Sequence, residues 1–464
     1  MATTTLTLHE ERRRNFIQNG DLWKVVLFIT APLAVYALFN YLYGFFDIFL
    51  VSHYIGTDQV ASVMFIDDIK ATIMAIGGGI AAGGTVFIAR HYGAGDYEEA
   101  RRHAGATLVL AVGLSVTIAL LGMAFAQPLL KLLNAPDAII TEGLGYYLLQ
   151  MASTVLIAFN AVYMGTERAK GNTKMILILN IAAMIVKIGL SALFVLALGL
   201  GTTYVALATL LAQGMLSALA FFVVFSRKNS IGVRLEDLTI RKRYALPILL
   251  LSLPVIAGRF LFSFGRVIVN SLATRYGLTA LAAFGIAMRL GGGPGAIASI
   301  FEETTVSVAS QNLGGKKLKR AFQTYGIANL YAILIAFTGM ILLVLSIDAV
   351  IPWFTTEANP ELVSLITQIF RYEKFSMISS STIAIVAALF VSFKNTKVTF
   401  ILNTIRVFAL RVPFLILFLA LDIGPVALGY AMFISNTTTA VIALVMIAVH
   451  YHKVRTFGYL DMRM

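Results

Sequence analysis

A single aspartate lies within a long apolar stretch near the start of the chain. Asp47 is flanked by Phe45, Phe46, Ile48 and Phe49. A carboxylate at membrane depth is costly unless it is paired or hydrated, so by default it marks a proton or cation site. Burial favours the neutral form of a carboxyl group, and Asp47 is therefore predicted to take up a proton. The alternative interpretation is a fixed structural ion pair.

A lysine in a second apolar stretch is the natural counter-charge for Asp47. Ser191 follows Lys187 by one helical turn and lies on the same face. Thr209 and Gln213 are four residues apart in the next apolar stretch, and they could complete a polar patch or serve as ordinary interhelical contacts. A pair between Lys187 and Asp47 would be either permanently closed or opened by a change of state.

The second half of the chain carries a cluster of arginines at membrane depth. Its members and their candidate carboxylate partners are Arg259, Arg266, Arg289, Arg406, Arg411, Glu302, Glu303 and Glu373. If every arginine is paired, the cluster is structural; otherwise it forms a cationic cavity suited to an anionic or zwitterionic group. Asp67, Asp68 and Lys70 are predicted to form a further hydrated patch in the first half.

The elements that must position these residues occur twice. Residues 24–226 and 244–450 each read as about six membrane-spanning helices. The repeat extends to single residues, because six of the ten aligned positions in 171–180 and 394–403 are identical. Order and direction are kept, so the two halves are predicted to share one topology.

Composition identifies an integral membrane protein. The chain has 464 residues, of which 59% are hydrophobic and 13% charged, and its mean hydropathy is +0.84. Only lipid could cover so much apolar surface. The predicted fold is all-α, with twelve transmembrane helices in two six-helix lobes. The predicted segments are a cytoplasmic N-terminal segment 1–23, a first lobe 24–226, a linker 227–243, a second lobe 244–452 and a tail 453–464.

The net charge of +13 follows the positive-inside rule. Lysine and arginine gather before the first span, in alternate loops and after the last span, which predicts that both termini are cytoplasmic. This placement explains the surplus without a nucleic-acid partner. With no cysteine, no phosphate-binding GxxxxGK[ST] motif and no long soluble segment, the sequence indicates neither a metal site nor ATP as energy source, and no enzyme.

Several motifs together carry a resemblance to a known family. They are Pro32 and Asp47, Tyr54-Ile55-Gly56 with Ala61, Gly93-Ala94-Gly95-Asp96 with Ala100, Gln311-Asn312-Leu313-Gly314-Gly315 with Ala321, and the Asn-Thr-Lys turn of both halves. Over nearly its whole length the chain resembles the multidrug and toxic compound extrusion (MATE) family, in particular its prokaryotic, DinF-like branch. That family lies in a superfamily with lipid-linked oligosaccharide flippases.

The resemblance implies two six-helix lobes in a V shape and export of drugs in exchange for protons or sodium. In these terms Asp47 looks like the coupling carboxylate, Pro32 like the proline about which its helix bends, and Thr209 like a threonine of the same site. An Asn-x-x-x-Asp pair of the branch falls on Lys187 and Ser191 here. This departure argues against sodium, because an ammonium group would take the place and charge of the ion.

The sequence therefore predicts a monomeric secondary exporter of amphiphilic or cationic organic compounds in a prokaryotic plasma membrane, without a cofactor and driven by proton entry. Two alternatives stay open: a flippase or exporter of an anionic, lipid-linked or other amphiphile held by the arginines, and sodium-coupled drug antiport. The residues predicted to line the substrate cavity are Tyr36, Asn40, Phe45, Asp67, Asn160, Tyr163, Gln213, Arg259, Arg266, Arg289, Glu373 and Arg406.

Overall fold

The computed structural model describes residues 6–55, 57–132, 140, 143–351 and 360–457, and every regular element within these ranges is helical. Among these described residues, ten helices are long and apolar enough to cross a membrane. Two further pairs, bent by 51° and 42°, bring the total to twelve if each pair counts as one span. The predicted all-α fold is confirmed, and the predicted twelve spans agree with this count. The chain divides into two compact units, Met1–Ile256 and Ala257–Met464.

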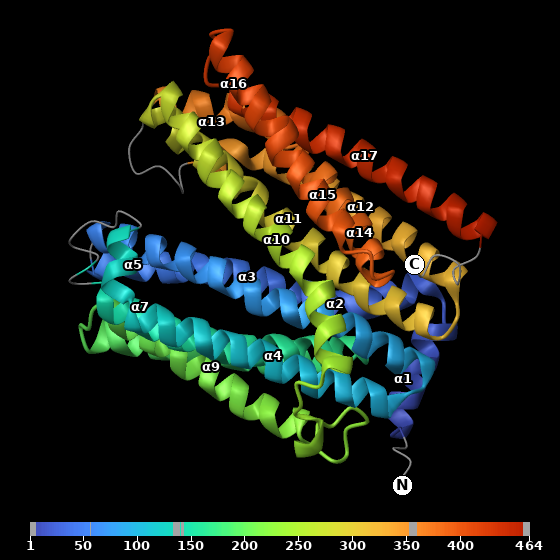
Figure 1. Cartoon of the computed structure of the whole chain (residues 1–464). Helices are drawn as coiled ribbons and strands as arrows, with labels where there is room; N and C mark the ends of the chain where they lie inside the picture. The colour runs from blue at the N-terminus through green and yellow to red at the C-terminus, as the bar shows by residue number, and fades with distance from the viewer. Residues whose placement is uncertain (1–5, 56, 133–139, 141–142, 352–359, 458–464) are drawn as a thin grey trace. The chain divides into compact units, whose positions relative to one another are not determined.

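The first unit is a helical bundle (Figure 1). Its elements are α1 (Leu8–Asn19), α2 (Leu22–Leu50), the π-helix η1 (Val51–Ile55), α3 (Thr57–Ala94), α4 (Tyr97–Ala124), α5 (Ala126–Leu132), α7 (Leu144–Ala169), α8 (Thr173–Ala192), the π-helix η2 (Leu193–Ala197), α9 (Thr202–Val224), the 3₁₀ turn η3 (Leu235–Asp237) and the start of α10 (Lys242–Ala273). Helix α7 packs against α3, α4 and α9, while α8 packs between α2 and α9. This places the predicted Asp47 and Lys187 helices side by side.

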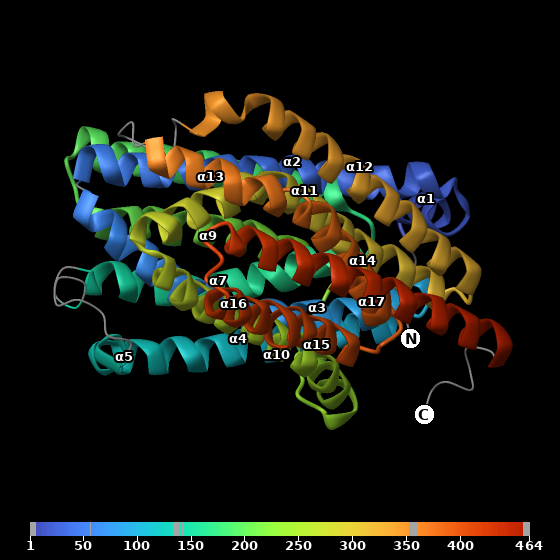
Figure 2. The same cartoon turned by 90° about the horizontal axis from the view of Figure 1, so that it is seen from above.

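The second unit repeats this plan. It comprises the rest of α10, the 3₁₀ turn η4 (Thr274–Tyr276), α11 (Leu278–Gly314), α12 (Leu318–Val350), α13 (Pro360–Glu373), α14 (Ser376–Ser392), α15 (Lys397–Thr404), the π-helix η6 (Ile405–Arg411), α16 (Val412–Ala420) and α17 (Ala427–Phe457). Helix α11 packs against α12, α13 and α14, and α17 lies along α14 and η6 (Figure 2). Residues from α13, α14, η6 and α17 are thereby brought together.

Backbone turns at equivalent places show the duplication most directly. Gly95 and Lys316 both have a positive φ, at 84° and 58°, and so do Gly171 and Lys394, at 75° and 63°. At each of the four turns, the amide of this residue donates to the carbonyl three residues earlier, and the next amide donates to the carbonyl five residues before it. This is the Schellman pattern that ends helices. The second half forms it with lysine, although left-handed backbone favours glycine.

The boundary between the two units falls inside α10. The first turns of this helix approach α3 closely: a Cβ on Gly83 would lie 2.2 Å from Ser252 Oγ, and one on Gly79 would lie 2.4 Å from Ile256 Cγ1. Glycine thus permits the close packing that joins the start of α10 to the first unit. The linker predicted at residues 227–243 separates the two sequence repeats, which is a different division from that into compact units. It stays a prediction.

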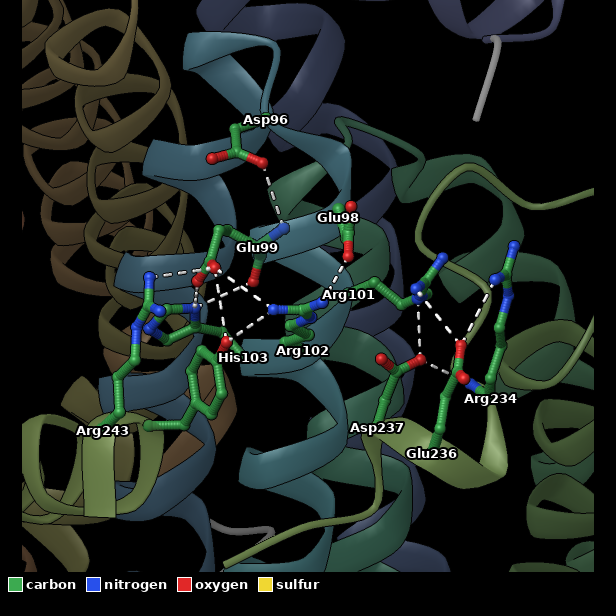
Figure 3. A network of polar contacts seen from close by, with 11 residues as sticks. Asp96, Glu98, Glu99, Arg101, Arg102, His103, Arg234, Glu236, Asp237 and Arg243 are labelled. Atoms are coloured by element: carbon green, nitrogen blue, oxygen red, sulfur yellow. Dashed lines mark hydrogen bonds and ion pairs between the residues drawn. The ribbon is translucent and has the colours of Figure 1, made fainter. Parts of the chain in front are cut away.

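The segment between the repeats is docked onto α4 by a buried ion pair (Figure 3). Arg101 Nε lies 2.7 Å from Asp237 Oδ2, and the two side chains are only 6% and 2% exposed. The approach is close because Gly105 faces this segment, where a Cβ would come within 2.3 Å of the Asp237 carbonyl oxygen. A charged pair of this kind, sealed from water, ties the linker to the helical bundle.

A second set of contacts in the same network joins α4 to the start of α10. Glu99 Oε1 lies 3.2 Å from Arg243 Nη2 and accepts a hydrogen bond of 3.3 Å from the Tyr244 hydroxyl. Arg102 Nη1 donates to that hydroxyl at 3.1 Å. Figure 3 shows Arg102 and Arg243 converging on Glu99. They fix the entry of α10 relative to α4.

Candidate functional site

Asp47 and Lys187 form an ion pair within the first unit. Asp47 lies on the last turn of α2, and Lys187 lies on α8, which packs along α2. Lys187 Nζ is 2.7 Å from Asp47 Oδ2, and the two side chains are 15% and 22% exposed. The structure thus places in contact two residues whose pairing the sequence left open. A close, mostly buried pair of opposite charges can act as a switch, because neutralising either member removes the attraction.

Tyr43 completes this site and was not found from the sequence. Its hydroxyl donates a hydrogen bond to Asp47 Oδ1, while Lys187 Nζ lies 4.1 Å from the centre of its ring. Both carboxylate oxygens of Asp47 are therefore engaged. The available signal was the spacing, since residues four apart share one face of a helix.

The other polar residues predicted near Lys187 divide into separate contacts. Thr209 donates to the carbonyl oxygen of Val205 in its own helix at 3.1 Å. Gln213 accepts a hydrogen bond of 2.8 Å from Asn160 Nδ2. Ser191 is fully buried, and its hydroxyl has no hydrogen-bond partner among the residues described. The structure thus pairs Gln213 with Asn160, whereas the sequence grouped it with Lys187.

Asp67 forms a second carboxylate centre in the first unit. Its Oδ1 accepts a hydrogen bond of 3.2 Å from the Tyr146 hydroxyl and lies 4.0 Å from Lys70 Nζ. Gln150 supports Tyr146 by donating to the same hydroxyl at 2.8 Å. The predicted association of Asp67 with Lys70 is present. The side chains of Asp68 and Phe45 lie outside the part that the structure describes.

The remaining predicted residues of the first unit lie on α2 and α7. Pro32 is inside α2, where its ring nitrogen cannot donate the helical hydrogen bond. Tyr36 is half-buried and Asn40 is exposed on the same helix. Tyr163 is fully buried, and no described residue hydrogen-bonds to its hydroxyl. Helix α2 therefore carries both the proline that interrupts its hydrogen bonds and the carboxylate that pairs with Lys187.

The arginines of the second unit differ in burial, and the proposed grouping of all five stays a prediction. Arg406 and Arg411 lie together in the interior, whereas Arg259, Arg266 and Arg289 are exposed. The carboxylate partner expected for the interior arginines is not at ion-pairing distance: Glu373 is only 5% exposed, and its Oε2 has no hydrogen-bond partner among the described residues. The partners are the neutral side chains of Ser380, Ser435 and Asn436.

No three side chains of His, Cys, Asp or Glu gather into a metal-binding group within the described ranges. The chemistry that the first unit offers is acid–base chemistry at Asp47, where a proton on the carboxyl group would compete with Lys187 for the same oxygen. The second unit offers two guanidinium groups whose hydrogen-bond partners among the described residues are neutral. The two sites differ in the sign of charge that they can accept.

Comparison with known proteins agrees with this architecture. A sequence profile of the MatE family matches twice, over residues 32–193 and 254–417. The multidrug export protein MepA of Staphylococcus haemolyticus is 22% identical over 370 residues, covering 78% of this chain and 80% of that protein.

Two solved structures share the fold closely. One is a MOP superfamily transporter from Pyrococcus furiosus, described by the reverse polarity of its binding pocket; it superposes with a TM-score of 0.91 at 21% identity, covering 97% of this chain and 100% of that one. The other is an outward-facing multidrug resistance MATE transporter, with a TM-score of 0.90 at 22% identity, covering 96% and 98% of the two chains.

Proposed function

The chain belongs to the MatE family of multidrug and toxic compound extrusion transporters, and on that premise we propose that it exports amphiphilic, chiefly cationic, organic compounds in exchange for protons. The observation that carries the proposal is the ion pair of Asp47 and Lys187, with Tyr43 on the second carboxylate oxygen. The relative from S. haemolyticus, named a multidrug export protein, supports the substrate class.

In the proposed cycle, the protonation state of Asp47 controls its contact with Lys187. A proton arriving from outside neutralises the carboxylate, so Lys187 loses its partner and the contact between α2 and α8 weakens. Helix α2 then bends at Pro32, where one backbone hydrogen bond is already missing. A compound bound near Asp47 is thereby displaced and leaves by alternating access. By linkage, binding of that compound must favour release of the proton.

Proton coupling is favoured over sodium coupling by the position of Lys187. Its ammonium group lies 2.7 Å from Asp47 Oδ2, at the distance a bound cation would need. A sodium ion would have to displace this charge and then share the site with it, which Coulomb repulsion opposes. A proton needs no such space, because it binds to the carboxylate itself.

The same proposal includes the setting of the protein. We infer a monomer that spans the plasma membrane, with both termini on the cytoplasmic side, no cofactor and no nucleic-acid partner. The distribution of lysine and arginine over alternate loops supports this orientation. Its partners are then the bilayer and small amphiphilic compounds.

Substrate-triggered proton release tests the proposal. The full chain is reconstituted in vesicles with a pH-sensitive dye, and ethidium is added as a cationic substrate. We expect proton release from the wild-type protein and none from Asp47→Asn. Asp348→Asn is the matched control, since Asp348 is an exposed carboxylate near the end of α12. Release that persists in Asp47→Asn and in Asp348→Asn alike would contradict the assigned role of Asp47.

A further inference from the structure

Two arginines of the second unit are brought together by an irregular turn of helix. Segment η6 is a π-helix that begins at Ile405 and ends at Arg411. In a regular α-helix, residues five apart point about 140° away from each other. In a π-helix the hydrogen bonds run between residues five apart, which brings such residues towards one face. Arg406 and Arg411 consequently reach the same acceptor, Asn436 Oδ1 on α17.

The contacts of these two guanidinium groups are all to neutral groups. Arg406 Nη2 donates to Ser380 Oγ at 2.7 Å, and Arg411 Nε donates to Ser435 Oγ at 3.1 Å. Arg411 Nη2 donates to Asn436 Oδ1 at 2.8 Å, and Arg406 Nε shares that oxygen. In the described part of the chain, neither arginine forms an ion pair. Two like charges thus meet at one amide oxygen.

Burial makes this arrangement unusual. Arg411 is 2% exposed, and buried arginines are almost always paired with an anion. Glu373 is buried in the same unit, but one carboxylate leaves the group of three with a net positive charge even when it is ionised. Neutral hydrogen-bonding side chains would be enough to hold η6 against α17 for a purely structural purpose. Two cations at one acceptor repel each other and so weaken that contact.

Part of each guanidinium group is still available. The Nη1 atoms of Arg406 and Arg411 donate to no described residue, and neither atom is among the buried side-chain atoms of the described residues that lack a hydrogen-bond partner. Arg406 also lies 4.9 Å from the centre of the Phe262 ring, which gives the charged group an apolar neighbour. Free N–H donors on two arginines that share one acceptor, with an aromatic ring beside Arg406, match an oxyanion attached to an apolar body.

We propose that Arg406 and Arg411, held side by side by the π-helix, bind the single oxyanion group of an anionic amphiphile, such as a carboxylate or a phosphate monoester. This site lies in the second unit, apart from Asp47. This proposal rests on the proposed export function in one respect, which is that the bound amphiphile is a compound that the protein transports. It extends the substrates of the transporter to organic anions.

Binding of laurate tests the site without any transport step. The full chain is placed in nanodiscs of phosphatidylcholine, and radiolabelled laurate or methyl laurate is equilibrated with it, with empty nanodiscs subtracted. The ester has the same apolar chain and no charge. We expect the wild-type protein to bind laurate about tenfold more tightly than the ester, the value of one charge-assisted hydrogen bond. Inorganic phosphate should displace laurate, since its anionic oxygen atoms can accept hydrogen bonds from the same guanidinium groups.

Two variants of the site and one control complete the experiment. Asn436→Asp supplies an internal carboxylate of nearly the same shape, so it should keep the fold and abolish the preference for laurate. Arg406→Gln should do the same by removing a donor. Arg275→Gln, an exposed arginine of η4, should leave the preference intact.

Equal binding of laurate and its ester by the wild-type protein, or a preference that survives in Asn436→Asp, would overturn the proposal. So would binding of inorganic phosphate without binding of laurate, because the ligand would then be a free anion. Ethidium-triggered proton release is measured on the same preparations. A failure of that release with intact laurate binding would count against the proposed function and leave the anion site standing.

Discussion

The ion pair of Arg101 and Asp237 predicts a large difference between two neighbouring arginines. Replacing Arg101 by Met leaves the Asp237 carboxylate 2% exposed, with the backbone amide of Arg234 as a remaining donor at 2.8 Å. Breaking a buried pair by removing one partner costs about 3–5 kcal/mol, because the other charge stays buried and uncompensated. We therefore expect Arg101→Met to lower the free energy of unfolding of the first unit by about that amount.

Arg102→Met is the control for this substitution. Arg102 is the next residue of α4 and is 37% exposed, and its carboxylate neighbours Glu98 and Glu99 are 57% and 17% exposed. Partly exposed pairs contribute about 0–1 kcal/mol, and the loss of the hydrogen bond from Arg102 to the Tyr244 hydroxyl adds about 1 kcal/mol, so this change should cost clearly less than Arg101→Met. In the double variant Arg101→Met with Asp237→Asn, the buried negative charge is gone, and we expect part of the lost stability to return.

Unfolding in mixed micelles, followed by circular dichroism as dodecyl sulfate is added, gives the free energies for the four proteins. The reasoning is refuted if Arg101→Met and Arg102→Met lose equal stability, or if the double variant is no more stable than Arg101→Met alone. Either outcome would mean that the charge of Asp237 reaches water without its partner, and that the linker is held by packing alone.

Two further predictions concern local backbone and pH. Lys394→Gly should stabilise the protein by about 1 kcal/mol in the same unfolding assay, because Lys394 has a φ of 63°, a backbone conformation that is unfavourable for any residue with a Cβ. Gly171→Lys at the equivalent turn should destabilise the protein by more than this amount, since its Cβ would also lie 2.5 Å from Ile17. Effects of equal size and opposite sign would contradict this packing argument. Burial works to raise the pKa of Glu10, but hydrogen bonds from Thr7 and Ser230 and the charge of Lys170 hold that pKa below its ordinary value of 4.5. The contribution of ionised Glu10 to stability is therefore complete above about pH 4.5 and is lost as the pH falls through the lowered pKa. Between about pH 6 and 3, the free energy of unfolding should therefore fall less in Glu10→Gln than in the wild-type protein.

Much of the architecture could be predicted because it depends on local composition. The twelve spans follow from the length of apolar segments, and the duplication follows from matched motifs such as those ending at Asn180 and Asn403. The left-handed turns at Gly171 and Lys394 agree with that alignment, even though the residue type differs.

Contacts between helices were harder to predict. The pairing of Gln213 with Asn160, the hydrogen bond from Tyr43 to Asp47, and the burial of Arg411 while Arg259 is exposed all depend on how each helix is rotated about its axis. Each residue turns a helix by about 100°, so an error of one position sends a side chain to another neighbour. The π-helix at η6 adds such a shift, and hydropathy carries no signal for it.

The sequence by itself thus determined that this chain is a duplicated, twelve-span membrane protein with an isolated carboxylate in its first span, because apolar length, charge and repetition are properties of the chain. Only the tertiary structure decided which charges meet. Asp47 and Lys187 are 140 residues apart and touch because α2 packs on α8. Arg406 and Arg411 converge on Asn436 because one turn of helix is widened. Both results depend on the relative rotation of packed helices, which the order of residues specifies only through the whole fold.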